Sequence, residues 1–149
     1  MVNIIMDFTQ KHALKQADPK YQAFTKRIQA KWQEKRKING KQCIAMREMC
    51  QLHHAMDLVR DKSFDFEETQ ESTDAVLNDA TGRDGEGWFW TYHNAAEEIE
   101  KSLIQKCIKV ANLAVQWDVL TETIAVLNKD QDEYGDKLVQ KAEANKSDK

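Results

Sequence analysis

Hydrophobic residues recur at alternating steps of four and three along the second half of the chain. Only Lys106 and Gln131 place a polar side chain on this line. A repeat of 3.5 residues is typical of helices that pack with coiled-coil or bundle geometry. We therefore predict a long helix from about Trp88 to Asn128, with an extension to about Ala144. The line holds Ile99, Leu103, Lys106, Val110, Leu113, Trp117, Leu120, Ile124 and Leu127, and Tyr134 and Leu138 continue it.

The first half predicts a basic helix over about 19–38. Asp18-Pro19 is a typical helix start, because Asp accepts a backbone N–H and proline gives up a donor that has no partner there. Asn39-Gly40 predicts its end, since both residues tolerate the left-handed conformation that closes helices. A short lead helix is predicted within residues 1–17.

A further helix is predicted over about 41–61, with two lines of apolar residues. Such a wide apolar face is typical of a helix that packs on two neighbours. The first line holds Ala45, Met49, Leu52, Met56 and Val59, and the second holds Cys43, Met46, Cys50 and His53.

Residues 63–87 are acidic and polar, and they predict an irregular loop with a single helical turn at Thr73-Asp74. Five glycines and one proline are too few for the turns of an all-β protein. We predict an all-α fold of four to five helices in one domain over 1–144. A disordered tail is predicted over 145–149.

The composition also bears on the compartment of the protein. No stretch approaches the ~18 consecutive apolar residues typical of a membrane helix, so we expect no membrane span. Cys43 and Cys50 are too far apart on one helix to form a disulfide, and three cysteines leave one unpaired. With no signal-peptide pattern at the start, these features favour the reducing cytoplasm.

Charge divides the chain into two halves. Residues 1–62 hold 13 Lys and Arg against 6 Asp and Glu, and residues 63–149 hold 9 against 19. The halves are expected to attract each other within one molecule or between two copies. The basic helix also leaves open nucleic-acid binding, although the pI of about 5.8 argues against it as the main role. Its basic patch consists of Lys26, Arg27, Lys31, Lys35, Arg36 and Lys37.

An aromatic cluster follows the acidic loop. A helix turns by ~100° per residue, so its four rings cannot all face one core. Core packing, a protein interface and a ligand pocket all remain open for this cluster. Because aromatic residues are enriched at interfaces, we predict an interface that contains Trp88, Phe89, Trp90, Tyr92 and Trp117.

Metal binding is the weaker hypothesis. The spacing of Cys43, Cys50, His53 and His54 is not a zinc pattern. Asp130-x-Asp132-x-Tyr134-Gly135 copies the start of a calcium loop, but Lys141 stands at its twelfth position. A helix break near Gly135 is the simpler interpretation.

Glu97 and Glu100 lie three residues apart, a spacing at which two carboxylates can share Mg²⁺. With Asp118 they resemble the E-x-x-E and E-x-x-D motifs of the all-α nucleotide pyrophosphohydrolases. The resemblance implies Mg²⁺-dependent hydrolysis of nucleoside triphosphates, with these three residues as metal ligands. Val115 stands where the family has its third Glu, and the unbroken heptad leaves no turn between the motifs. A charged, solvated helix face is the preferred interpretation.

We therefore predict a non-catalytic helical protein-interaction module, an adaptor or inhibitor of a larger protein partner, with no cofactor. Such small helical chains are frequent among accessory proteins of phages and mobile elements. A homodimer is expected, because pairing two long helices would cover the apolar line. The alternatives are the pyrophosphohydrolase and a nucleic-acid-binding protein.

Overall fold

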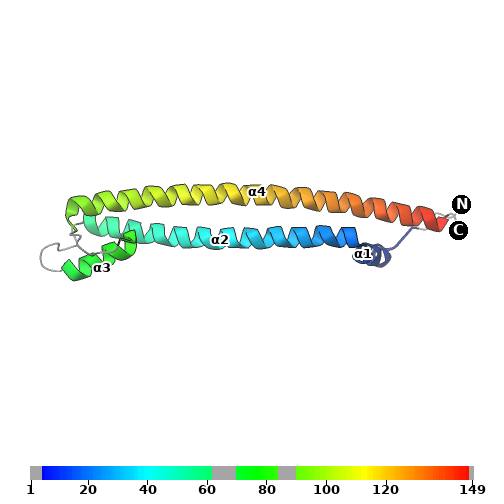
Figure 1. Cartoon of the computed structure of the whole chain (residues 1–149), viewed down its shortest axis with the longest axis horizontal. Coiled ribbons are helices and arrows are strands. Elements are labelled where there is room, and N and C mark those ends of the chain that lie inside the picture. The colour runs from blue at the N-terminus through cyan, green and yellow to red at the C-terminus, as the bar shows by residue number, and fades with distance from the viewer. Residues whose placement is uncertain (1–4, 62–69, 84–89, 148–149) are drawn as a thin grey trace. The chain divides into compact units, whose positions relative to one another are not determined.

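A computed structural model describes residues 5–61, 70–83 and 90–147. These ranges contain four helices and no strand, so the all-α class and the long C-terminal helix are confirmed. The helices are α1 (Phe8–Ala17), α2 (Pro19–Arg60), α3 (Gln70–Thr81) and α4 (Tyr92–Ser147) (Figure 1).

The chain divides into two compact units, and α2 and α4 contribute residues to both. The terminal unit consists of Met1–Lys37 and Gln116–Lys149, and the central unit of Ile38–Val115. The single domain expected over 1–144 stays a prediction.

Side-chain caps begin three of the helices. The Asp7 carboxylate accepts from the Gln10 backbone N–H, and the Gln10 side chain accepts from that of Asp7. Asp18 accepts from the backbone N–H of Tyr21 at 2.9 Å, which confirms the predicted start of α2. Thr91 and Asn94 exchange the same pair of bonds at the start of α4. These bonds satisfy N–H groups that have no partner within the helix.

The predicted helix end at Asn39-Gly40 is wrong, because α2 continues through both residues for 42 residues in all. A Cβ on Gly40 would meet nothing within 4 Å, so no close contact requires glycine there. Ile38 and Ala45 are both buried on either side of it. Their packing outweighs the cost of about 1 kcal/mol that glycine adds to a helix interior.

The irregular loop predicted over 63–87 is also wrong in its middle part, where α3 forms three turns instead of one. Thr73 and Leu77 are buried on its inner side. Gly82 follows the helix with a φ of 70°, the left-handed conformation expected for a glycine after a helix end.

Helix α4 has no break at Gly135 and continues to Ser147, so both the predicted break and the start of the disordered tail at 145 are wrong. Residues 148 and 149 lie outside the described residues. A Cβ on Gly135 would lie 3.0 Å from Lys15 Cε and 3.1 Å from Tyr21 Cε2. The glycine therefore allows α1 and α2 to approach α4 closely.

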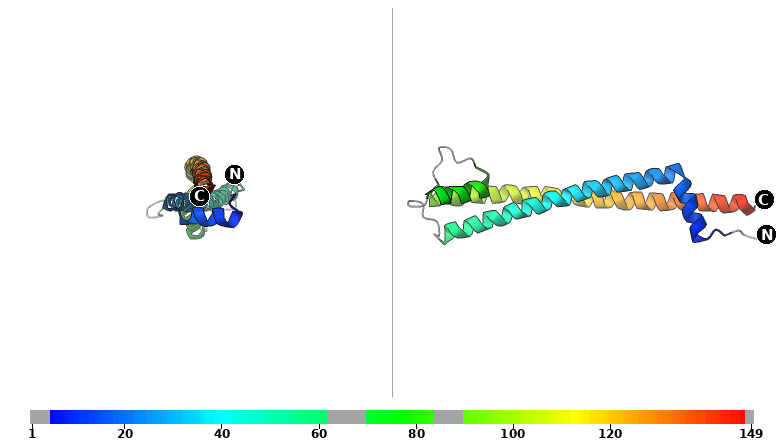
Figure 2. Two further views of the ribbon diagram at one scale, coloured as in Figure 1. Left: turned by 90° about the vertical axis from the view of Figure 1, so that its right-hand side faces the viewer. Right: turned by 90° about the horizontal axis from the view of Figure 1, so that it is seen from below.

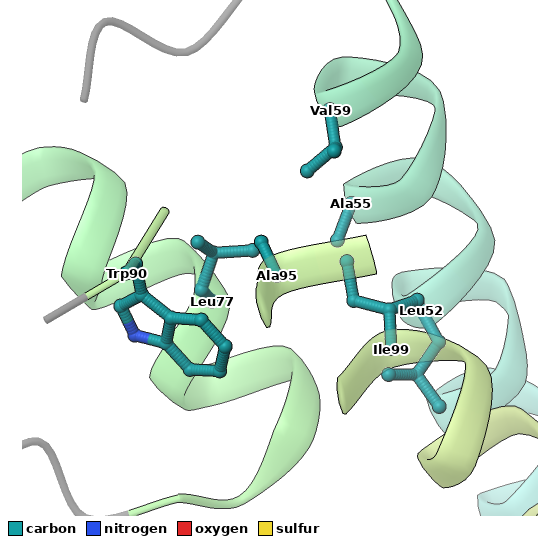
Figure 3. Close-up of a cluster of buried hydrophobic side chains, with 7 residues drawn as sticks. All are labelled: Leu52, Ala55, Val59, Leu77, Trp90, Ala95 and Ile99. Atoms are coloured by element: carbon teal, nitrogen blue, oxygen red, sulfur yellow. The ribbon is translucent and has the colours of Figure 1, made fainter. Parts of the chain in front are cut away.

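The core of the central unit joins α2, α3 and α4 (Figure 3). Leu77 of α3 lies between Trp90 and Ala95, while Leu52 of α2 lies beside Ile99 of α4. Trp90 is 2% exposed, and its Nε1 donates to Asn78 Oδ1 at 2.9 Å. The indole thus fills the core and still satisfies its polar atom.

In the terminal unit, α2 and α4 run antiparallel. Gln131 of α4 donates to Thr25 Oγ1 at 2.8 Å near the start of α2, and Trp117 lies beside Lys35 further along it. Helix α1 runs across α4 at this end rather than alongside it (Figure 2, right). The Tyr134 hydroxyl donates to Asp18 Oδ1 at 2.9 Å, which joins α4 to the start of α2.

The Asp18 contacts predict a pH dependence of stability. The Tyr21 backbone N–H, and then the Tyr134 hydroxyl, lower the pKa of Asp18 below its usual 3.8. A carboxylate with a lowered pKa stabilises the folded state above its unfolded pKa, and this contribution is lost as the pH falls through the folded pKa. The bond to Asp18 also raises the pKa of Tyr134.

The variant Asp18→Asn isolates this effect, because Asn also caps helices well but carries no charge. We expect wild type to have the higher melting temperature at neutral pH and the difference to shrink toward zero below about pH 4. Thermal unfolding followed by circular dichroism measures it. A difference that stays constant across this range would contradict the assignment.

Candidate interaction surfaces

The apolar line of α4 is covered by α2 of the same chain in each unit. Every residue of that line from Ile99 to Leu138 is buried or half-buried. Helix α2 carries a matching line with the same 3.5-residue repeat, and none of its residues is exposed. Coverage within one chain removes the reason for which a homodimer was expected. The α2 line holds Tyr21, Phe24, Ile28, Lys31, Lys35, Ile38, Gln42, Ala45, Met49, Leu52, Met56 and Val59.

Both polar exceptions on the α4 line have a partner on α2. In the central unit Lys106 forms an ion pair with Glu48. In the terminal unit Gln131 donates to Thr25 Oγ1 and to the Tyr21 carbonyl. Polar pairs of this kind specify the register of packed helices.

Trp117 and Lys35 form a third contact of this kind. Lys35 is only 7% exposed, and its Nζ lies 4.1 Å from the centre of the Trp117 ring and 4.9 Å from that of Trp32. Two cation–π contacts thus compensate for burial of the ammonium group. Lys35 is therefore buried rather than part of the exposed basic patch, and Trp117 contacts it inside the terminal unit.

The other aromatic residues of the predicted interface lie in different environments. Trp90 belongs to the core, so its assignment to a surface is corrected, whereas Tyr92 is 50% exposed. Trp88 and Phe89 lie outside the described residues. Core packing therefore accounts for the largest buried ring of this cluster.

The remaining basic patch is spread around α2. Lys31 is half-buried and pairs with Glu34 at 3.3 Å, while Lys26, Arg27, Arg36 and Lys37 are exposed. Gln29, Trp32, Gln33 and Arg36 line a shallow hollow on the outer side of α2. Of these exposed residues, Arg36 lines the hollow together with the Trp32 ring.

The carboxylates of the metal hypothesis do not form a cluster. Glu97 contacts Lys101 at 3.2 Å and His93 at 3.9 Å, while Glu100 and Asp118 are exposed on the same uninterrupted helix. Within the described ranges, no three His, Cys, Asp or Glu side chains are placed to hold a metal ion. At Glu97, helix α4 presents a charged face, which is the interpretation that the sequence analysis preferred.

The second apolar line predicted for the 41–61 helix does not pack on a neighbour. Cys43, Met46, Cys50 and His53 are all exposed, so the second line was wrongly placed in the core. The segment does pack on two neighbours, α3 and α4, through Leu52, Ala55 and Val59. Helix α4 also exposes apolar side chains in the central unit. Ile104, Ile108 and Val115 are 54%, 57% and 62% exposed. We define the central apolar face as seven exposed residues of α2 and α4 in this unit: Cys43, Met46, Cys50, Ile104, Cys107, Ile108 and Val115.

The heptad positions place this face on one edge of the α2–α4 pair. If the seam positions are a and d, then Met46 and Cys107 are e residues, whereas Ala55 and Ala95 are g residues. In an antiparallel pair the e residues of both helices share one edge. Since Leu77 and Trp90 cluster with Ala55 and Ala95, α3 covers the g edge and leaves the e edge open. The sequence signal for this face was the Ile104–Ile108 spacing outside the main line, which our interpretation of the sequence missed.

Helix α4 also meets a length and hydropathy test for crossing a membrane. Tyr92–Lys146 contains an 18-residue window of mean hydropathy 1.2, of which 17% is buried. The core helices of soluble proteins pass this test as well, so it is weak evidence for a span. The chain matches no protein-family model, and neither the curated proteins nor the solved structures contain a significant match to it.

Proposed function

We propose that the chain is a non-catalytic protein-binding module that holds an apolar-faced helix of another protein on its central apolar face. The exposure of Ile104, Ile108 and Val115 on α4 carries the proposal. Contiguous apolar patches of this kind are uncommon on monomeric proteins and mark interaction sites. An adaptor or an inhibitor of a larger partner fits this surface.

The spacing of the face favours a helical partner. Ile104 and Ile108 lie four residues apart, and Ile108 and Val115 lie seven apart. The same spacings occur along the apolar line that α4 packs against α2. A helix can dock on such a row through its own i, i+4 and i+7 side chains. None of the seven side chains is acidic or basic, and this favours an apolar contact over an ionic one.

The exposed thiols support the cytoplasm as the compartment. Cys43, Cys50 and Cys107 are free and accessible, and a reducing environment preserves this state. The pyrophosphohydrolase and nucleic-acid hypotheses stay predictions, because no arrangement of the described side chains favours either one.

A photo-crosslinking amino acid at position 108 tests the proposal in cells that produce the chain. We expect one discrete adduct with another protein, and mass spectrometry should map it to an apolar-faced helix. Position 109 is the matched control, because Lys109 is exposed at a g position of α4, on the edge opposite the face. The substitution Val115→Glu should remove the adduct from position 108 without changing the circular dichroism spectrum, since Val115 is 62% exposed.

Three outcomes would overturn the proposal. The first is the absence of any adduct from position 108, and the second is an equal adduct from position 109. The third is co-sedimentation of the purified chain with lipid vesicles that Val115→Glu abolishes, because α4 would then bind a membrane through this face. An adduct with a second copy of the chain would likewise contradict the choice of partner.

A further inference from the structure

The terminal unit separates its charges between two helices. Residues 19–37 of α2 contain seven Lys and Arg and one Glu, while residues 116–136 of α4 contain six Asp and Glu and one Lys. Lys35 lies at Trp117 and Thr25 at Gln131, so the two segments are side by side. The unit therefore carries a basic strip beside an acidic strip.

These strips do not neutralise each other within the chain. Across the described part of the terminal unit, no ion pair joins α2 to α4, and the Lys31–Glu34 pair lies on α2 itself. Lys26, Arg36, Asp118 and Glu122 are all exposed. Their charges are available to a partner that places an acidic strip on the basic strip and a basic strip on the acidic strip.

Heptad positions place these four residues and Trp32 toward one edge. Trp32 is an e residue, Arg36 and Asp118 are b residues, and Lys26 and Glu122 are f residues. Trp32 is 46% exposed and lines the hollow with Gln29, Gln33 and Arg36. A large ring at the centre of a charged surface is the usual composition of an interface anchor.

We propose that two copies of the chain associate through this edge of the terminal unit, so that α2 of one copy lies on α4 of the other. A two-fold axis along the helices places Arg36 at the level of the partner's Asp118 and Trp32 near the partner's Glu122. Each interface contains the same contacts twice, as an isologous dimer requires. This surface lies in a different unit from the central apolar face, so the inference does not rest on the proposed function.

Two charge-reversal variants test the dimer. The first carries Lys26→Glu and Arg36→Glu, which reverses the two α2 charges at this edge. The second carries Asp118→Lys and Glu122→Lys, which reverses the two α4 charges at this edge. We expect wild type to sediment as a dimer at micromolar concentration and each variant alone to dissociate about tenfold more readily or more.

An equal mixture of the two variants should restore the dimer. The reversed charges on α2 of the first variant then meet the reversed charges on α4 of the second, and unchanged charges meet at the other contact. The control variant Arg27→Glu with Lys37→Glu changes the same number of charges away from this edge and should dimerise like wild type. The wild-type dimer should also weaken in about 1 M salt, where the Debye length is about 3 Å.

Wild type that remains monomeric at all concentrations would overturn the inference. So would a mixture that stays monomeric, or a control variant that dissociates as readily as the first variant. The substitution Ile108→Glu on the central apolar face should leave the dimer unchanged. Loss of the dimer by that variant would assign self-association to the central unit instead.

Discussion

Replacing Trp90 with alanine is expected to lower the free energy of unfolding by about 3–5 kcal/mol. The indole is 2% exposed in the core that joins α2, α3 and α4, so its removal leaves a cavity there. The substitution also leaves Asn78 without the donor that it accepts from. Chemical denaturation followed by circular dichroism measures the change.

Two variants separate core packing from other roles of this segment. Trp90→Phe should lose less stability than Trp90→Ala, because a ring remains while the bond to Asn78 is lost. Tyr92→Ala, only two residues away, should change stability by less than about 0.5 kcal/mol because the ring is half exposed. If Tyr92→Ala destabilised the chain as much as Trp90→Ala, the core assignment would be wrong.

Replacing Gly135 with leucine is expected to destabilise the chain by about 1–3 kcal/mol. The new side chain would meet Lys15 and the Tyr21 ring, which lie 3.0 and 3.1 Å from the Cβ position. Relief requires α1 or α2 to move away from α4, and the bond between Tyr134 and Asp18 would be strained with them. Thermal unfolding measures the loss.

A substitution at Gly40 is expected to have the opposite effect on stability. Its Cβ position is open and its backbone is helical, so Gly40→Ala should raise the free energy of unfolding by up to about 1 kcal/mol. If Gly40→Ala and Gly135→Leu both left stability unchanged, the packing described for the two glycines would be wrong.

Heptad periodicity was sufficient to predict the inner lines of α4, because it repeats over many turns and each turn supplies an independent observation. Asp18-Pro19 likewise predicted the start of α2, since capping depends on the residue itself and its next three neighbours. Lys106 and Gln131 could be recognised as exceptions to the α4 line. Their partners Glu48 and Thr25 could not, because both lie far away in the sequence on another helix.

Gly40 and Gly135 show why helix ends were harder to predict. Both were interpreted as breaks, although both lie inside long helices. Glycine lowers local helix stability by about 1 kcal/mol, which packing along α2 and α4 exceeds. At Gly135 the residue serves a contact with α1, and no local pattern contains that contact.

The candidate surfaces were predicted least well, because exposure depends on which edge of a helix another element covers. Cys43, Met46 and Cys50 form a regular apolar line, yet they are open because α3 packs on the other edge. Trp90 and Tyr92 are similar in type and only two residues apart, but only Trp90 faces that core. Their surroundings come from elements that are remote in the chain.

Composition and periodicity were enough to specify an all-helical chain, the 3.5-residue line of α4 and the division into basic and acidic segments, since these are properties of local sequence. Packing between distant segments determined that α2 covers α4, that both glycines lie within helices and that the edge opposite α3 stays open. Local propensities amount to about 1 kcal/mol at a position, whereas burial of a large side chain contributes several times more.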